Sequence, residues 1–285
     1  MTVIVGLLCQ DGIVIASDSQ ETDEGAGMKR LDVTKVYDTK RFHFDDAEII
    51  VGGTGSAAYI ARAAELIQEK GYAPHFTTPR SVATIVEDAI GEMGERYGGG
   101  EDGLDLELMI GVYCANCPKS DDPPMSPIGL YSVYPPGEDE KVGVAEPVTD
   151  YAAMGTGGLF ARYLLNRLHD EDHPTSKLSM ESAIREAVYV IEEVTKVDLY
   201  CGGPTQLFCI RKQADGKFKL ERKRPAEIRK IAAGLASSDV EVKKKQREII
   251  LGASPLPKEK AAARTLRQVP TPGGSAQSLE GKQSA

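Results

Sequence analysis

Two short apolar runs open the chain. Residues 2–9 read TVIVGLLC and residues 12–17 read GIVIAS, and Asp11-Gly12, a favoured pair for a hairpin turn, joins them. Both runs are apolar at nearly every position, whereas a half-exposed strand would alternate apolar and polar residues. The pattern therefore predicts two antiparallel strands in a sheet that is covered on both faces.

Further along, the spacing of apolar residues switches between a period of two and a period near 3.6. It predicts strands at residues 35–37, 41–44, 48–51, 104–114, 128–134, 151–154, 206–211 and 217–220. It predicts helices at residues 56–70, 81–97, 159–168 and 179–195. This order of elements favours an α+β fold, a four-layer αββα sandwich in which each of two packed sheets carries a helix pair.

The sequence changes character after residue 222. Residues 225–252 combine helix-forming stretches with clusters of Lys and Arg, and from residue 254 onward Pro, Gly, Ser, Lys and Gln dominate. A segment with so few apolar residues cannot build a core of its own. We therefore expect a globular domain at residues 2–222, a basic, partly helical C-terminal extension at residues 223–253 and a disordered tail at residues 254–285.

Composition and charge narrow the function classes. Of the 285 residues, 41% are hydrophobic and 27% are charged, and no apolar run approaches the roughly 18–20 residues of a membrane span. The net charge of −9 disfavours nucleic acid as a partner. Residues 217–285 hold 16 basic and 7 acidic residues, a charge of +9, against 18 basic and 36 acidic residues, a charge of −18, in residues 1–216. The apolar start lacks a basic leader, so we expect a cytoplasmic protein without membrane contact.

The first candidate for chemistry is Thr2. It directly follows the initiator Met, and a small second residue generally permits removal of Met1. The mature chain would then begin with a Thr that carries a free α-amine, whose ordinary pKa of ~7.7–8.0 leaves a sizeable fraction neutral. One residue would supply both a hydroxyl nucleophile and its proton acceptor. Thr is common in second place, so its position alone favours an ordinary terminal residue.

The residues around Thr2 resemble a known family. TVIVGLLCQDGIVIASDS is similar to the opening of catalytic proteasome β-type subunits and of the simpler bacterial proteasome-like peptidases, with Thr2, Gly6 and Asp18 in register. Lys35 in VTKVYD matches the family's catalytic Lys after a one-residue insertion. The resemblance implies the N-terminal nucleophile hydrolase fold. It also implies that Lys35 stabilises charge on the Thr2 oxygen, while Asp18 holds Lys35 charged and oriented.

Three later turns extend the resemblance to residue 211. Gly52-Gly53-Thr54-Gly55 is similar to the turn whose backbone amide forms an oxyanion hole, a role carried over to Gly52, with Gly53 as the alternative. In YAAMGTGG, Thr156 stands where the family has Ser. In TKVDLYCGG, Asp198 matches the family's Asp, and Cys201 replaces a Ser and is a weaker hydrogen-bond donor. Thr156, Asp198 and Cys201 would orient the Thr2 amine.

The resemblance implies a threonine-type endopeptidase that acts on peptides or unfolded proteins in a homo-oligomeric, proteasome-like ring. It implies no cofactor, and it leaves room for an ATPase unfoldase as a partner, which the basic extension could dock. Two other functions stay open: a small-amide amidase of the same superfamily, and a proteasome-like structural subunit that assembles without cutting. Retention of Met1 would favour the second of these.

Two further groups have the spacing of metal ligands. Cys114 and Cys117 lack a second pair that would complete a zinc site, and the odd total of five cysteines favours reduced thiols. His169 and His173 lie beside Pro174 and lack the Glu placement of a metallopeptidase, which favours a solvated turn. No metal is expected.

Overall fold

The structure is a computed structural model that describes residues 2–23, 28–38, 47–71, 77–98, 104–118, 126–136, 142–169 and 172–250. The chain divides into two units, residues 1–238 and residues 239–285. The predicted strand at residues 41–44 and the predicted tail at residues 254–285 lie outside the described residues.

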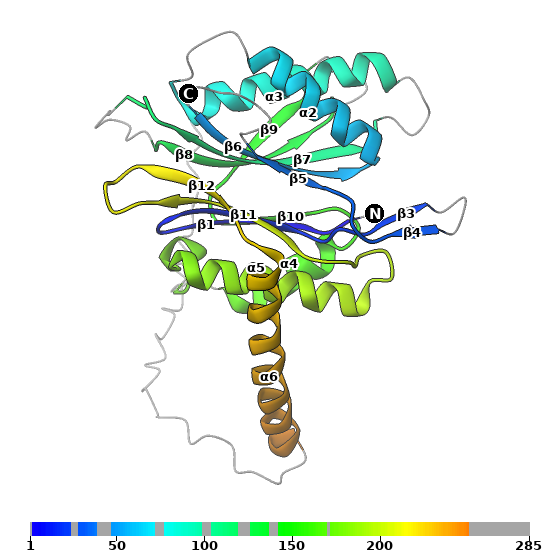
Figure 1. Cartoon of the computed structure of the whole chain (residues 1–285), viewed down its shortest axis with the longest axis vertical. Helices are drawn as coiled ribbons and strands as arrows, with labels where there is room; N and C mark the ends of the chain where they lie inside the picture. Colours follow the sequence, from blue (N-terminus) through cyan, green and yellow to red (C-terminus); the bar gives the residue numbers. More distant parts are fainter. Residues whose placement is uncertain are drawn as a thin grey trace, which may run out of the picture. The chain divides into compact units, whose positions relative to one another are not determined.

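Two five-stranded antiparallel sheets form the centre of the first unit (Figure 1). One sheet has the order β10-β1-β2-β11-β12, with β1 (Ile4–Cys9), β2 (Gly12–Ser17), β10 (Tyr151–Met154), β11 (Gln206–Lys212) and β12 (Phe218–Arg222). The other has the order β5-β6-β7-β8-β9, with β5 (Val36–Asp38), β6 (Ala47–Gly55), β7 (Leu106–Cys114), β8 (Ile128–Tyr134) and β9 (Val144–Val148). A separate hairpin joins β3 (Glu21–Asp23) to β4 (Met28–Arg30). The prediction of a mixed α and β protein with antiparallel sheets is confirmed.

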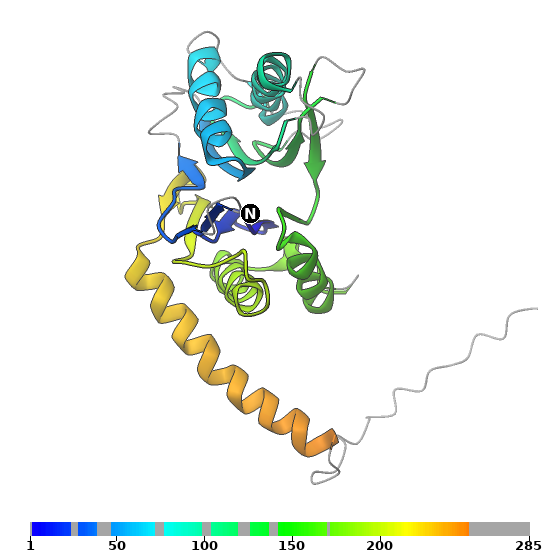
Figure 2. The same cartoon turned by 90° about the vertical axis from the view of Figure 1, so that its right-hand side faces the viewer.

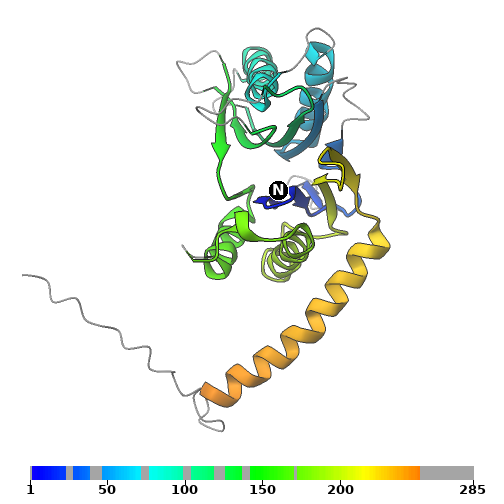
Figure 3. The same cartoon turned by 90° about the vertical axis from the view of Figure 1, so that its left-hand side faces the viewer.

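Each sheet packs against its own pair of helices. Helices α2 (Ala57–Gly71) and α3 (Pro79–Tyr97) contact the β5–β9 sheet, and α4 (Gly158–Leu168) and α5 (Met180–Val197) contact the sheet that contains β1. Figures 2 and 3 show the α2–α3 pair and the α4–α5 pair on opposite sides of the sheets. The remaining helical elements are η1 (Thr175–Lys177) and α6 (Pro225–Ile250). No helix within the described residues is long and apolar enough to cross a membrane.

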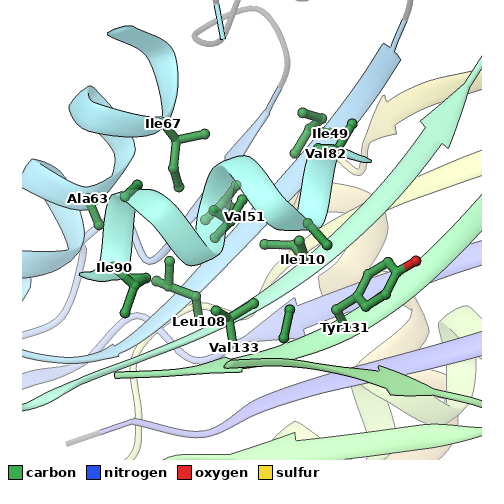
Figure 4. Packing of buried hydrophobic residues seen from close by; sticks show 14 of the residues in the cluster. Ile49, Val51, Ala63, Ile67, Val82, Ile90, Leu108, Ile110, Tyr131 and Val133 are labelled. Carbon is green, nitrogen blue, oxygen red and sulfur yellow. The ribbon is translucent and has the colours of Figure 1, made fainter. Parts of the chain in front are cut away.

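Three apolar clusters hold these elements together. One lies between the β5–β9 sheet and its helices, where Ile49 and Leu108 face Ile67 and Ile90 (Figure 4). A second joins β1, β2 and β11 to α4 and α5, and a third joins the two sheets. Side chains of β1 and β2 alternate between the second and third clusters, so nearly every position is buried. This confirms the prediction that both strands are covered on both faces.

The apolar pattern did not predict β9 or the β3–β4 hairpin. Strand β9 lies at the edge of its sheet and contains Pro147, which the sequence pattern treats as a break. Proline is tolerated at a sheet edge because its missing N–H removes no bond to a further strand. Strands β3 and β4 are three residues each, too short for a period to show.

The turn between β1 and β2 requires glycine at position 12. Gly12 has φ +143°, and a Cβ there would lie 1.8 Å from the carbonyl oxygen of Ile210. We predict that Gly12→Ala lowers the free energy of unfolding by about 3 kcal/mol or more. The new Cβ would overlap the backbone of Ile210, and the positive φ would strain any residue other than glycine. Urea unfolding of the full chain measures it.

The matched control is Gly216→Ala. Gly216 also has a positive φ, +83°, but nothing lies within 4 Å of the Cβ position, so only strain of about 1 kcal/mol is expected. Equal losses for the two variants would show that crowding at Ile210 does not matter.

Candidate active site

Thr2 lies two residues before β1, and hydrogen bonds to its backbone fix its position. Its nitrogen, the peptide nitrogen of the full-length chain, donates to Thr156 Oγ1 at 3.2 Å. Its carbonyl oxygen accepts from the Gly157 N–H at 3.2 Å and from Thr156 Oγ1 at 3.4 Å. The turn between β10 and α4 therefore fixes Thr2, which is 1% exposed in the full-length chain. Removal of Met1 would turn this nitrogen into an α-amine beside a hydroxyl.

Asp18 is the point at which four segments meet. One carboxylate oxygen accepts the Val3 N–H at 3.1 Å and the Lys35 ammonium at 2.9 Å. The other accepts the N–H groups of Gln20 at 3.2 Å and Gly202 at 2.9 Å. Asp18 is fully buried. A buried carboxylate is stable only with such partners, so Asp18 joins the start of β1, the end of β2, the Gly202 turn and Lys35.

Lys35 is buried beside Asp18. It is 3% exposed, and its Nζ also donates to the backbone oxygen of Gln20. Burial lowers the pKa of Lys35 from its ordinary 10.5, while the charge of Asp18 and its hydrogen bond oppose this shift. The ion pair therefore keeps an ammonium in a place that would otherwise favour the neutral amine.

The backbone that carries Lys35 is clamped by Gln206, at the first residue of β11. Gln206 Oε1 accepts the N–H groups of Lys35 at 3.1 Å and Val36 at 3.4 Å, and its Nε2 donates to the Val33 oxygen at 2.5 Å. These bonds link the sheet that contains β1 to the start of β5 in the other sheet. Gln206 was not predicted from the sequence, because a lone Gln in an apolar run gives no sign of which backbone it contacts.

Thr156, Cys201 and Asp198 form a connected group on the other side of Thr2. Cys201 Sγ donates to Asp198 Oδ2 at 3.5 Å, and a side-chain hydrogen bond also connects Cys201 with Thr156. Burial, followed by the charges of Asp18 and Asp198, raises the pKa of Cys201 to about 12. At neutral pH Cys201 is therefore a thiol that hydrogen-bonds its neighbours and is a poor nucleophile.

The backbones of Gly52 and Gly53 lie within the β5–β9 sheet. The Gly53 N–H donates to the Lys35 oxygen at 2.9 Å. Neighbouring residues of a strand direct their N–H groups to opposite sides, so the Gly52 N–H faces β7, where Gly52 pairs with Met109. An amide that is used in a sheet ladder is poorly placed to bind a substrate oxygen.

Gly55, three residues further on, is a better candidate for that role. By the same alternation its N–H is directed away from β7, and it lies beyond the last pair of the β5–β6 ladder, Val36 with Gly52. Gly55 has φ +103°, and a Cβ there would lie 2.2 Å from the Asp105 oxygen. Gly55 also lines the cleft beside Thr156.

That cleft has a volume of about 920 Å³ and is lined in part by the turn between β10 and α4, which contacts Thr2. Residues 54–55 at the end of β6, 104–107 at the start of β7, 134–135 after β8, 153–156 after β10 and Arg162 on α4 form its walls. Because Thr156 contacts the Thr2 backbone, the cleft is a place where a substrate could lie beside Thr2.

The other sequence candidates lie away from this corner. Cys114 and Cys117 are free thiols. His169 follows the last residue of α4, and its ring contacts Glu186 and the His173 oxygen. Among the described residues, no three His, Cys, Asp or Glu side chains are grouped to hold a metal ion.

Several solved structures that are similar to this chain are Anbu proteins. Anbu from Yersinia bercovieri, described as an ancestral beta-subunit, matches with a TM-score of 0.65 and 16% identity over 90% of this chain and 99% of that chain. The Anbu complex from Pseudomonas aeruginosa, a helical assembly, matches with a TM-score of 0.58 and 19% identity over 90% and 98%. A Gly-1 mutant of Anbu from Hyphomicrobium sp. strain MC1 matches with a TM-score of 0.61 and 16% identity over 86% and 97%. Neither a protein-family model nor a curated protein matches the chain.

These likenesses establish the fold, and they correct the family drawn from the sequence. The assignment to proteasome β-type subunits or to the simpler bacterial proteasome-like peptidases is wrong, because the matching structures are those of a separate group, the Anbu proteins. The error has a physical reason. The motifs around Thr2, Asp18 and Lys35 describe one corner of the fold, and a shared corner cannot distinguish the groups that use it.

The Asp18–Lys35 pair gives a direct prediction. Asp18→Asn removes the charge that faces the buried Lys35 ammonium, and we expect it to lower the free energy of unfolding by roughly 3–5 kcal/mol. The double variant Asp18→Asn/Lys35→Met removes both charges and should recover part of that loss. Urea unfolding of the two single variants and the double variant gives the coupling energy.

The matched control is the exposed pair of Arg30 and Glu21, 3.3 Å apart. Glu21→Gln should cost less than about 1 kcal/mol. Strictly additive losses for Asp18→Asn and Lys35→Met would mean that the two charges do not depend on each other.

Proposed function

We propose that the mature chain is an N-terminal threonine hydrolase that cleaves peptide bonds within an oligomer of the Anbu type. The observation that carries the proposal is the position of Thr2. Its nitrogen contacts Thr156 on one side, and on the other its neighbour Val3 shares Asp18 with the buried Lys35 ammonium. A hydroxyl, its own amine and a cation are the parts that acyl transfer from an amide needs.

The proposed reaction begins after removal of Met1. The Thr2 hydroxyl attacks the substrate carbonyl and its proton passes to the Thr2 amine. Lys35 stabilises the charge that develops on the Thr2 oxygen, and the Gly55 amide donates to the tetrahedral oxyanion. The amine then gives its proton to the leaving nitrogen, and water hydrolyses the ester on Thr2. Thr156, Cys201 and Asp198 position the amine.

The fold proposed for this chemistry is the four-layer αββα sandwich of N-terminal nucleophile hydrolases. The proposed domain is residues 2–222, followed by the basic extension at residues 223–253 and the tail at residues 254–285. Ile228 of α6 is 4% exposed and packs in the apolar cluster with α4 and α5, which supports contact between the first turns of the proposed extension and the domain. The proposed substrates are peptides or unfolded protein segments.

Intact mass and covalent labelling test the nucleophile. We predict that the purified protein has lost one methionine and forms one adduct with a β-lactone, because the Thr2 hydroxyl is the acylated group. Thr2→Ala should form no adduct. Cys201→Ser is the matched control and should still form it, since the Cys201 thiol is not the nucleophile. Retained Met1, or an adduct on Thr2→Ala, would contradict the proposal.

The pH dependence of kcat/KM follows from two groups. On the acid side, the rate should rise as the α-amine loses its proton. The ordinary pKa of an α-amine is ~7.7–8.0, and the Lys35 ammonium beside it would lower that pKa, so the rise should lie at or below this range. On the alkaline side, the rate should fall as Lys35 loses its charge. Because burial lowers the pKa of Lys35 below 10.5, that fall should begin below pH 10.5. A rate that stays level past pH 10.5 would exclude Lys35 as the essential cation.

Measurements on the same purified protein distinguish the proposed peptidase from two other functions. An amidase would act on small acyl amides and leave a panel of fluorogenic peptides intact. A structural subunit would assemble but would retain Met1 and bind no β-lactone.

A further inference from the structure

The cleft beside Thr2 has charged side chains on two different walls. Asp105 and Glu107 belong to the start of β7, and Arg162 belongs to α4. Within the described part of the chain, none of these three side chains forms an ion pair or a side-chain hydrogen bond. The cleft therefore has a net negative charge that the fold itself does not neutralise.

Glu107 lies on the face of its sheet that is turned toward the other sheet. Its neighbours Leu106 and Leu108 pack into the cluster with α2 and α3, while Met109 packs into the cluster between the sheets. Since side chains of a strand alternate, Glu107 shares the inter-sheet face with Met109. It pairs across the strands with Thr54, which also lines the cleft.

Asp105 lies next to the proposed oxyanion donor. Its carboxylate oxygen Oδ1 is 3.0 Å from the position that a Cβ of Gly55 would occupy. Its backbone oxygen accepts the Ser56 N–H at 3.1 Å, which fixes this residue at the end of β6. Asp105 and Glu107 both line the cleft, as does Thr156, which contacts the Thr2 backbone.

A half-buried carboxylate without a partner favours binding of a cation, because a cation offsets the lost hydration. Glu107 is half-buried and Asp105 is exposed. An acidic side chain placed against the same wall would be repelled by both. An apolar side chain would leave both carboxylates unpaired.

We propose that Glu107 and Asp105 select substrates with a Lys or Arg side chain at the position bound in this cleft. The inference rests on the proposed peptidase function, because it assigns the substrate class of the same site. Glu107 and Asp105 act on which peptide is bound, and neither takes part in bond breaking.

Binding to the full-length Thr2→Ala protein tests the charge preference without cleavage. The probes are two fluorescent peptides that differ only in Lys against the uncharged norleucine, measured by anisotropy at low salt. We expect the Lys peptide to bind about 5-fold more tightly, the effect of roughly one partly exposed ion pair. Adding Glu107→Gln and Asp105→Asn should bring the ratio close to one.

The control is Arg162→Gln, which removes a charge of opposite sign from the α4 wall of the same cleft. It should increase the preference for the Lys peptide. A ratio near one in the Thr2→Ala protein, or a ratio that Glu107→Gln and Asp105→Asn leave unchanged, would overturn the inference.

Cleavage of the same peptides by the wild-type protein tests the charge preference and the peptidase function separately. Cleavage without a preference for Lys would overturn the charge selection and leave the peptidase. Tighter binding of the Lys peptide without cleavage or β-lactone adduct would overturn the peptidase and leave a cleft that binds cationic peptides.

Discussion

The ion pair between Asp18 and Lys35 is the interaction on which the rest of the site depends. Both side chains are almost fully buried, and a buried charge is stable only when it is paired with an opposite charge and hydrogen-bonded. The Asp18 carboxylate accepts hydrogen bonds from the Lys35 ammonium and from three backbone N–H groups. Loss of Asp18 would therefore release the start of β1, the Gly202 turn and the ammonium together. The fold and the proposed catalytic corner share this one constraint.

Thr2 lies between two kinds of support. On one side is the ion pair of Asp18 and Lys35. On the other side Cys201 forms hydrogen bonds with Asp198 and Thr156, and Thr156 accepts a hydrogen bond from the Thr2 nitrogen. A thiol with a pKa of about 12 contributes no charge of its own at neutral pH. This division fits the proposed chemistry, because the terminal amine has to accept and release a proton, whereas the cation beside the hydroxyl has to stay charged.

The sequence predicted the elements that a long apolar period defines. It also singled out Asp18 and Lys35, which form a buried ion pair, and Asp198 and Cys201, which share a hydrogen bond, while their roles in catalysis stay predictions. It did not predict β9 or the β3–β4 hairpin, because a Pro at a sheet edge and strands of three residues leave no period. The roles of Gln206 and Gly55 could not be predicted from the sequence for a different reason. Their roles depend on which backbone group faces which neighbour, and this is set by strand register across two sheets. The family assignment failed because short motifs describe a corner of the fold and not the group of proteins that uses it.

The central claim is that a buried Lys35 ammonium, held by Asp18, lies beside the hydroxyl of a terminal Thr2. A crystal structure of the purified protein after loss of Met1 measures this directly. The account predicts that Lys35 Nζ lies within hydrogen-bond reach of Thr2 Oγ1, about 2.6–3.2 Å, with Asp18 still bound to Nζ. A Lys35 side chain turned into solvent, or a Thr2 hydroxyl more than about 5 Å from Nζ, would contradict it.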